Sequence, residues 1–84
     1  METKIAVVAV IVSDYGAVEK VNAIFHDFRD YVVGRMGVPY RQKGVNIISV
    51  VLDAPAETIN SVSGKLGMID GVSSKVLTAK RENG

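Results

Sequence analysis

Residues 4–12, which read Lys-Ile-Ala-Val-Val-Ala-Val-Ile-Val, constrain the fold more than any other part of the sequence. Successive side chains of a β-strand point to opposite faces of the sheet, so a strand with one wet face alternates polar and apolar residues. The two alternating sets here are Ile5, Val7, Ala9, Ile11 and Ala6, Val8, Val10, Val12. Because both sets are apolar, both faces of this strand need to be dry, and either set could face a layer of helices.

The remaining chain alternates helix and strand patterns. Apolar residues at helical spacing predict a first helix from residue 17 to 28 and a second from about residue 55 to 67, which Gly67 would end in a left-handed conformation. Residues 45–53 repeat the pattern of residues 4–12, being apolar on both faces. Residues 31–39 predict a weaker strand at a sheet edge or bulge, since they contain two glycines and a proline. Residues 72–79 predict a final strand.

The resulting order, βαββαβ, predicts an α+β, ferredoxin-like fold with a four-stranded antiparallel sheet and two helices on one face. Right-handed crossovers place the first and third strands in the centre of the sheet, which agrees with their apolar character. We expect a single domain over residues 1–84, with a core at about residues 4–80.

Composition excludes several kinds of site. The chain has no cysteine, which removes disulfides, thiolate metal sites and thiol nucleophiles, and is compatible with a reducing cytoplasm. The net charge of +1 gives no strong attraction to nucleic acid or membrane. We therefore expect a cytoplasmic protein with no cofactor, no metal, no direct nucleic-acid binding and no membrane association.

Two helices cover only one face of such a sheet, which leaves roughly six large apolar side chains on the other face. Burying them would contribute on the order of 10 kcal/mol per subunit, and association costs roughly 4–15 kcal/mol. Monomers rarely expose apolar patches of that size. We therefore expect a homo-oligomer, either a dimer or a dimer of dimers, that forms through the sheet. The alternative is that loops or the tail fold over the face.

Several motifs resemble known families. Residues 12–18, Val-Ser-Asp-Tyr-Gly-Ala-Val, resemble the Asp-x-x-Gly-x-Leu start of ACT domains, which are small regulatory ligand-binding modules. Residues 34–39 and 63–67, followed by Ile69-x-Gly71-Val72, resemble small stand-alone proteins called iron-only hydrogenase system regulators. The resemblance spans residues 5–80. It implies an ACT-like fold, an oligomer, and a regulatory role beside iron-only hydrogenase or its maturation machinery. The layout is also similar to the C-terminal domain of nickel-responsive repressors, but His26 is the single histidine where their metal site needs several and a cysteine.

The ACT resemblance implies a ligand-binding role for the turn after the first strand, at a subunit interface, formed by Ser13, Asp14, Tyr15, Gly16 and Ala17. Exposed N–H groups at a helix start can hold an anion there, although Asp14 would repel one. The alternative interpretation is a helix cap with a turn glycine. Arg35, in the edge strand, could clamp a carboxylate or phosphate, or could block unwanted strand pairing.

No catalytic residues can be assigned. His26 is predicted to lie opposite the apolar stripe of the first helix, as a solvated surface side chain, and no Ser-His-Asp or Cys-His set can be assembled. The leading hypothesis is a non-enzymatic regulatory module that binds a small-molecule effector or a partner protein. The alternatives are a small enzyme on the same fold and a structural adaptor without a ligand.

Overall fold

The computed structural model describes residues 2–80, and its elements follow the predicted order. The strands and helices are β1 (Lys4–Val12), η1 (Tyr15–Ala17), α1 (Val18–Asp27), η2 (Arg29–Tyr31), β2 (Val32–Tyr40), η3 (Arg41–Lys43), β3 (Val45–Ala54), α2 (Ala56–Gly67) and β4 (Val72–Thr78). The η elements are single turns of 3-10 helix that connect the longer elements. Neither α1 nor α2 is long and apolar enough to cross a bilayer, and the same is true of every other helix within residues 2–80.

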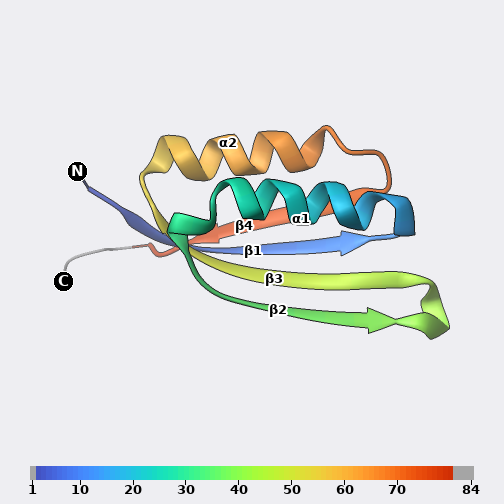
Figure 1. Ribbon diagram of the computed structural model, residues 1–84. Coiled ribbons are helices and arrows are strands. Elements are labelled where there is room, and N and C mark those ends of the chain that lie inside the picture. Colours follow the sequence, from blue (N-terminus) through green and yellow to red (C-terminus); the bar gives the residue numbers. More distant parts are fainter. Residues whose placement is uncertain (1, 81–84) are drawn as a thin grey trace.

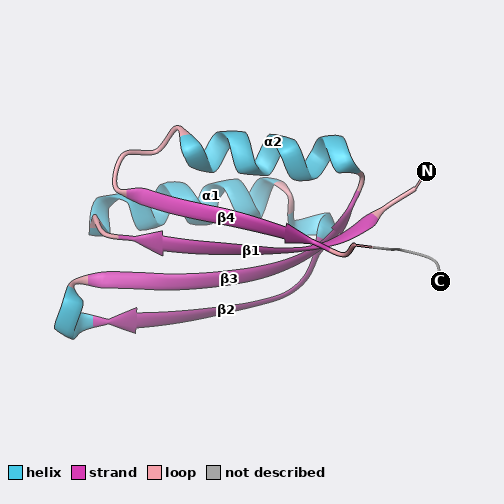
Figure 2. Ribbon diagram, turned by 180° about the vertical axis from the view of Figure 1, so that it is seen from behind, coloured by secondary structure: helices cyan, strands magenta, loops and turns pink. Residues whose placement is uncertain are grey.

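The four strands form one antiparallel sheet in the order β2-β3-β1-β4. The prediction that the first and third strands are central is therefore confirmed, as is the ferredoxin-like arrangement of the whole chain. Both helices lie on the same side of the sheet (Figure 1). In the view from behind, no element of residues 2–80 covers the strands (Figure 2).

The structure resolves which apolar set of β1 faces the helices. Ala6, Val8, Val10 and Val12 are at most 1 % exposed, whereas Ile5 and Ile11 are 42 % and 49 % exposed. On β3 the helix-facing set contains Ile48, Val50 and Leu52. These side chains pack against the apolar stripes of the two helices, which consist of Val21 and Phe25 on α1 and Ile59, Val62 and Leu66 on α2.

The opposite side of the sheet, called here the uncovered face, presents three rows of side chains across the strands. The register from β2 to β4 defines these rows as Gly34–Val51–Val7–Leu77, Met36–Ser49–Ala9–Lys75 and Val38–Ile47–Ile11–Ser73. The outer two rows are mainly apolar, and the middle row has the small residues Ser49 and Ala9 at its centre. A nearly continuous apolar surface therefore lies in solvent.

A β-bulge in β2 decides which of its side chains belong to this face. Val32 pairs with Leu52 and Gly34 pairs with Val51, so one extra residue is inserted between them. The insertion shifts the alternation by one residue. Arg35 consequently pairs with the helix-facing Val50, and Met36 pairs with Ser49 on the uncovered face. The predicted edge strand is confirmed, although it runs through Pro39 and ends at Tyr40.

The prediction for the end of the second helix was wrong. Gly67 belongs to α2, and of the glycines within residues 2–80 only Gly44 and Gly71 have positive φ. The helix ends in a tight turn in which the Met68 N–H donates to carbonyls in its last turn. The chain reverses later, at Gly71, whose φ is 81°. There its backbone lies against Asp14, and a Cβ at position 71 would stand 2.7 Å from the Asp14 Cβ.

Replacing Gly71 by alanine should therefore cost more than the same replacement at Gly44. Both positions carry the left-handed penalty of about 1–2 kcal/mol, but a Cβ at Gly44 meets no atom within 4 Å. The clash with Asp14 should add roughly 1–3 kcal/mol at Gly71. Urea denaturation of Gly71→Ala and Gly44→Ala measures the difference, and equal losses in the two variants would contradict this close packing.

Candidate functional site

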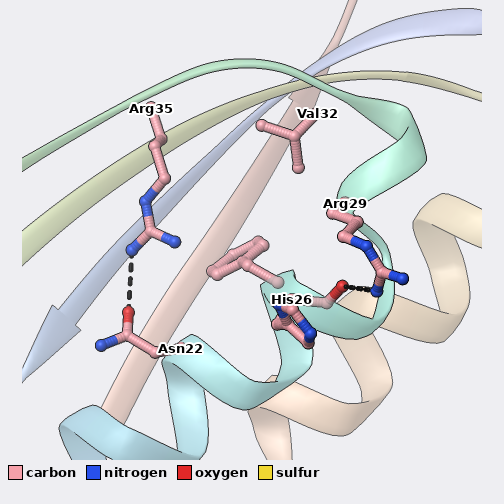
Figure 3. Close-up of a pocket in the computed structure, with 6 residues that line it drawn as sticks. Asn22, His26, Arg29, Val32 and Arg35 are labelled. Carbon is pink, nitrogen blue, oxygen red and sulfur yellow. Dashed lines mark hydrogen bonds between the residues drawn. The ribbon is translucent and has the colours of Figure 1, made fainter.

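A concave pocket of about 460 Å³ opens where α1, η2 and the start of β2 meet. Six residues line it: Asn22, Phe25, His26, Arg29, Val32 and Arg35. All come from residues 22–35, because the chain leaves α1, makes the single turn η2 and returns along the sheet edge as β2. Figure 3 shows the polar side chains of Arg35 and Asn22 on one side of the pocket and that of Arg29 on the other.

Arg35 reaches from β2 toward α1. Its Nη2 donates a hydrogen bond of 2.8 Å to the Asn22 side-chain oxygen on α1, and its guanidinium lies 5.7 Å from the centroid of the Phe25 ring. A guanidinium in this position over an aromatic face gains a cation–π attraction. The side chain is exposed, so this geometry is held by Asn22 and Phe25 rather than by burial.

Arg29 supplies a second cation to the pocket. Its Nη1 donates a 2.9 Å hydrogen bond to the backbone carbonyl of His26, whose imidazole also lines the pocket. The hydrogen bonds of both guanidinium groups within residues 2–80 thus go to neutral oxygens rather than to carboxylates. The walls are therefore rich in cationic donors, and the floor is the apolar surface of Phe25 and Val32.

The turn after β1 is organised by hydrogen bonds within the chain. The Asp14 side chain accepts a 2.9 Å hydrogen bond from the Gly16 N–H and caps η1. The Ser13 N–H and hydroxyl both donate to the Gly71 carbonyl, at 2.8 and 3.1 Å. Ala17 is buried in the core, while Tyr15 is exposed. This geometry matches the interpretation of the turn as a helix cap, and its role in ligand binding stays a prediction.

Within one chain, this turn and Arg35 lie apart. The turn is bonded to Gly71, which precedes the edge strand β4, whereas Arg35 lies on the opposite edge strand, β2. None of residues 13–17 lines the pocket around Arg35. The predicted site residues therefore divide into two separate places, and only Arg35 belongs to a concave one.

Asn22, His26 and Arg29 were not predicted as site residues. Their spacing of four and three places them on one side of a helix, next to the apolar stripe that contains Phe25, and this polar row was the available signal. The sequence interpretation treated His26 as a solvated surface side chain, which is correct for its exposure, but it did not foresee that the edge strand β2 brings Arg35 to this row. No group of three or more histidine and acidic side chains within residues 2–80 lies close enough together to hold a metal ion.

Comparison with known proteins identifies the family. Residues 4–76 match the TM1266-like family, described as "Iron-only hydrogenase system regulator, putative". The chain belongs to this family. The resemblance found in residues 5–80 is therefore confirmed. No curated protein matches the sequence.

Solved structures agree with the family assignment. The uncharacterized protein TM1266 from Thermotoga maritima is 34 % identical and superposes with a TM-score of 0.90, over 94 % of this chain and 100 % of that chain. A formyltetrahydrofolate deformylase from Pseudomonas putida KT2440 is 20 % identical with a TM-score of 0.59, over 88 % of this chain but 28 % of that one. The second likeness shows the ACT-like fold alone.

The capping role of Asp14 can be tested against a role for its charge. Asp14→Ala should lower the free energy of unfolding by about 1 kcal/mol, because the Gly16 N–H loses its acceptor. Asp14→Asn keeps a side-chain oxygen and should lose less than half as much. Urea denaturation of both variants gives the comparison. If asparagine destabilises as much as alanine, the carboxylate charge and not the acceptor is what the turn requires.

Proposed function

We propose that this chain is a non-enzymatic regulatory module that works in the cytoplasm as a homo-oligomer within the iron-only hydrogenase system. Membership in a family described as a regulator supports the regulatory role. The observation that carries the assembly is the uncovered face, whose apolar rows cross all four strands. A monomer rarely keeps so wide an apolar surface in water, and a second copy of the same face would bury it.

The shape of the uncovered face suits a copy of itself. Its central side chains, Ala9 and Ser49, are small, and the rows on either side carry larger groups such as Ile11, Ile47 and Val7. Two hollows of about 190 and 390 Å³ lie along β1 and β4 on this side. Larger side chains of a second copy can fill such hollows, as ridges fill grooves when two sheets pack face to face. A two-fold axis through the face makes the same residues meet in both copies, as a dimer or a dimer of dimers requires.

A dimer through this face leaves the pocket of Arg35 open, because the pocket lies on the helix side of the sheet. The same subunit can therefore associate through one side and contact an effector or partner protein through the other. This division of the two sides favours a regulator over a structural adaptor, which needs no pocket. A small enzyme remains the alternative of a different class, and turnover by the purified protein without a partner would favour it.

A charge placed on the uncovered face should prevent association. In Ile11→Lys the ammonium group would be buried in the interface at a cost on the order of 3 kcal/mol in each copy, and the two copies together would weaken the dimer roughly ten-thousandfold. Met68→Lys is the matched control, because Met68 is 83 % exposed at the end of α2, away from this face. Analytical ultracentrifugation at micromolar concentration should give an oligomer of the 9.0 kDa chain for the wild type and the control, and a monomer for Ile11→Lys. A monomeric wild type would refute the assembly.

The connection to hydrogenase has its own test. Deleting the gene in the organism that encodes this chain should change either the transcript level of the iron-only hydrogenase or its activity per unit of hydrogenase protein. A transcript change indicates action on expression, and an activity change at constant transcript indicates action on the enzyme or its maturation. If neither changes under conditions that induce the hydrogenase, the proposed role is wrong.

A further inference from the structure

The pocket between α1, η2 and β2 combines charges and apolar surface in a way that the proposed assembly does not use. We propose that it binds a small organic anion, with its carboxylate or phosphoryl group held by the guanidinium groups of the pocket walls and an apolar body on the floor. This inference rests on the proposed function, since a regulatory module needs an effector, but it concerns the side of the sheet away from the proposed interface.

The two arginines are held in position before any ligand arrives. Arg35 is fixed by Asn22 at 2.8 Å and Arg29 by the His26 carbonyl at 2.9 Å. Each guanidinium has several further N–H donors, which remain for an oxyanion. Guanidinium pairs with carboxylate or phosphate through two parallel hydrogen bonds, which adds geometric specificity to the charge attraction. Because the side chains are already ordered, less conformational entropy is lost on binding.

The charges of the lining residues favour an anion over a cation. Of the six, two are arginines, one is a histidine and none is a carboxylate. Asn22 presents its oxygen to Arg35, so its amide nitrogen is a further donor for the ligand. Figure 3 shows the Arg35 and Arg29 side chains on opposite sides of the pocket with His26 between them, so a ligand in the pocket faces guanidinium donors from both β2 and η2.

The apolar part of the floor favours an organic anion over a bare inorganic ion. Phe25 is only 2 % exposed beneath the Arg35 guanidinium, so the apolar surface that a ligand can cover comes mainly from Val32, which is partly buried beside it. An aromatic or aliphatic body placed there would gain roughly 25 cal/mol for each Å² removed from water. The volume of about 460 Å³ falls within the range of roughly 300–1,000 Å³ typical of small-molecule sites. A nucleic acid strand would need a longer basic surface than this single hollow.

Titration of the 15N-labelled protein, followed by NMR, tests the proposal with four probes. Benzoate and phenyl phosphate supply the two anionic groups on an aromatic body, inorganic phosphate supplies the charge alone, and benzamide supplies the body alone. We expect saturable shifts at the Asn22 side-chain amide and the Arg35 Nε–H with benzoate or phenyl phosphate. Inorganic phosphate should bind at least tenfold more weakly, and benzamide should not saturate. Whichever of benzoate and phenyl phosphate binds more tightly shows whether the pocket prefers a carboxylate or a phosphoryl group.

Arginine variants separate the pocket from general charge. Arg35→Gln and Arg29→Gln should each weaken the better probe roughly tenfold, the loss expected for one charge-assisted hydrogen bond. Arg41→Gln removes the same charge from η3, outside the pocket, and should leave affinity within about twofold, since salt screens distant charges. If all three variants lose affinity equally, the effect comes from net charge and not from the pocket, which contradicts the proposal. The absence of saturable shifts with every anion would also overturn it.

The variant Ile11→Lys allows the proposed anion binding to be tested separately from the proposed association. That variant should lose association but keep the affinity of the pocket, because Ile11 lies on the uncovered face and the pocket lies on the other. A monomeric wild type that binds phenyl phosphate or benzoate would refute the assembly and leave the site standing. An oligomer that binds none of the anions would refute the site and leave the assembly standing.

Discussion

The pairing of β1 with β3 is the interaction on which the rest of this structure depends. These strands match residue for residue from Lys4 opposite Ala54 to Val12 opposite Asn46, and both are apolar on their two faces along most of their length. The single layer of two helices shields only one face of the sheet from water. The core, the positions of the edge strands and the exposed apolar surface all follow from this one-sided cover. A strand pair that is apolar on both faces therefore leaves one apolar face in solvent, and that face is the basis of the proposed assembly.

The element order and the central position of these two strands could be predicted from the sequence because period and apolarity are local signals. Which face of this strand pair meets the helices could not be predicted from the sequence. Ile5, Val7, Ala9 and Ile11 are as apolar as Ala6, Val8, Val10 and Val12, so pattern alone does not say which set meets the helices. The end of α2 was mispredicted for a related reason, since two glycines lie within four positions of each other. Only the approach of the chain to Asp14 shows why Gly71 takes the left-handed conformation.

The candidate site, too, could be predicted only in part from the sequence. Arg35 was predicted because an arginine between glycines in an edge strand could clamp a carboxylate or phosphate, with the blocking of unwanted strand pairing as the alternative. Asn22 and Arg29 were not, because their role depends on which strand passes over their side of α1, and that is a tertiary fact. The turn of residues 13–17 was predicted from a family resemblance. In the structure the Ser13 hydroxyl donates to the Gly71 carbonyl and the Asp14 carboxylate accepts from the Gly16 N–H, which a sequence motif does not reveal.

The bulge in β2 has a consequence for how this edge strand can vary. Its extra residue lets Gly34 lie two positions after Val32 and still face the other side of the sheet, so that Arg35 faces the helices and Met36 the uncovered face. Losing the extra residue would make the pairing regular without exchanging the two sides, because the residue after Val32 would still pair with Val51 and Arg35 with Val50. Relatives that lack the bulge should therefore keep both surfaces, and should lose only the local bend and added twist of the edge strand.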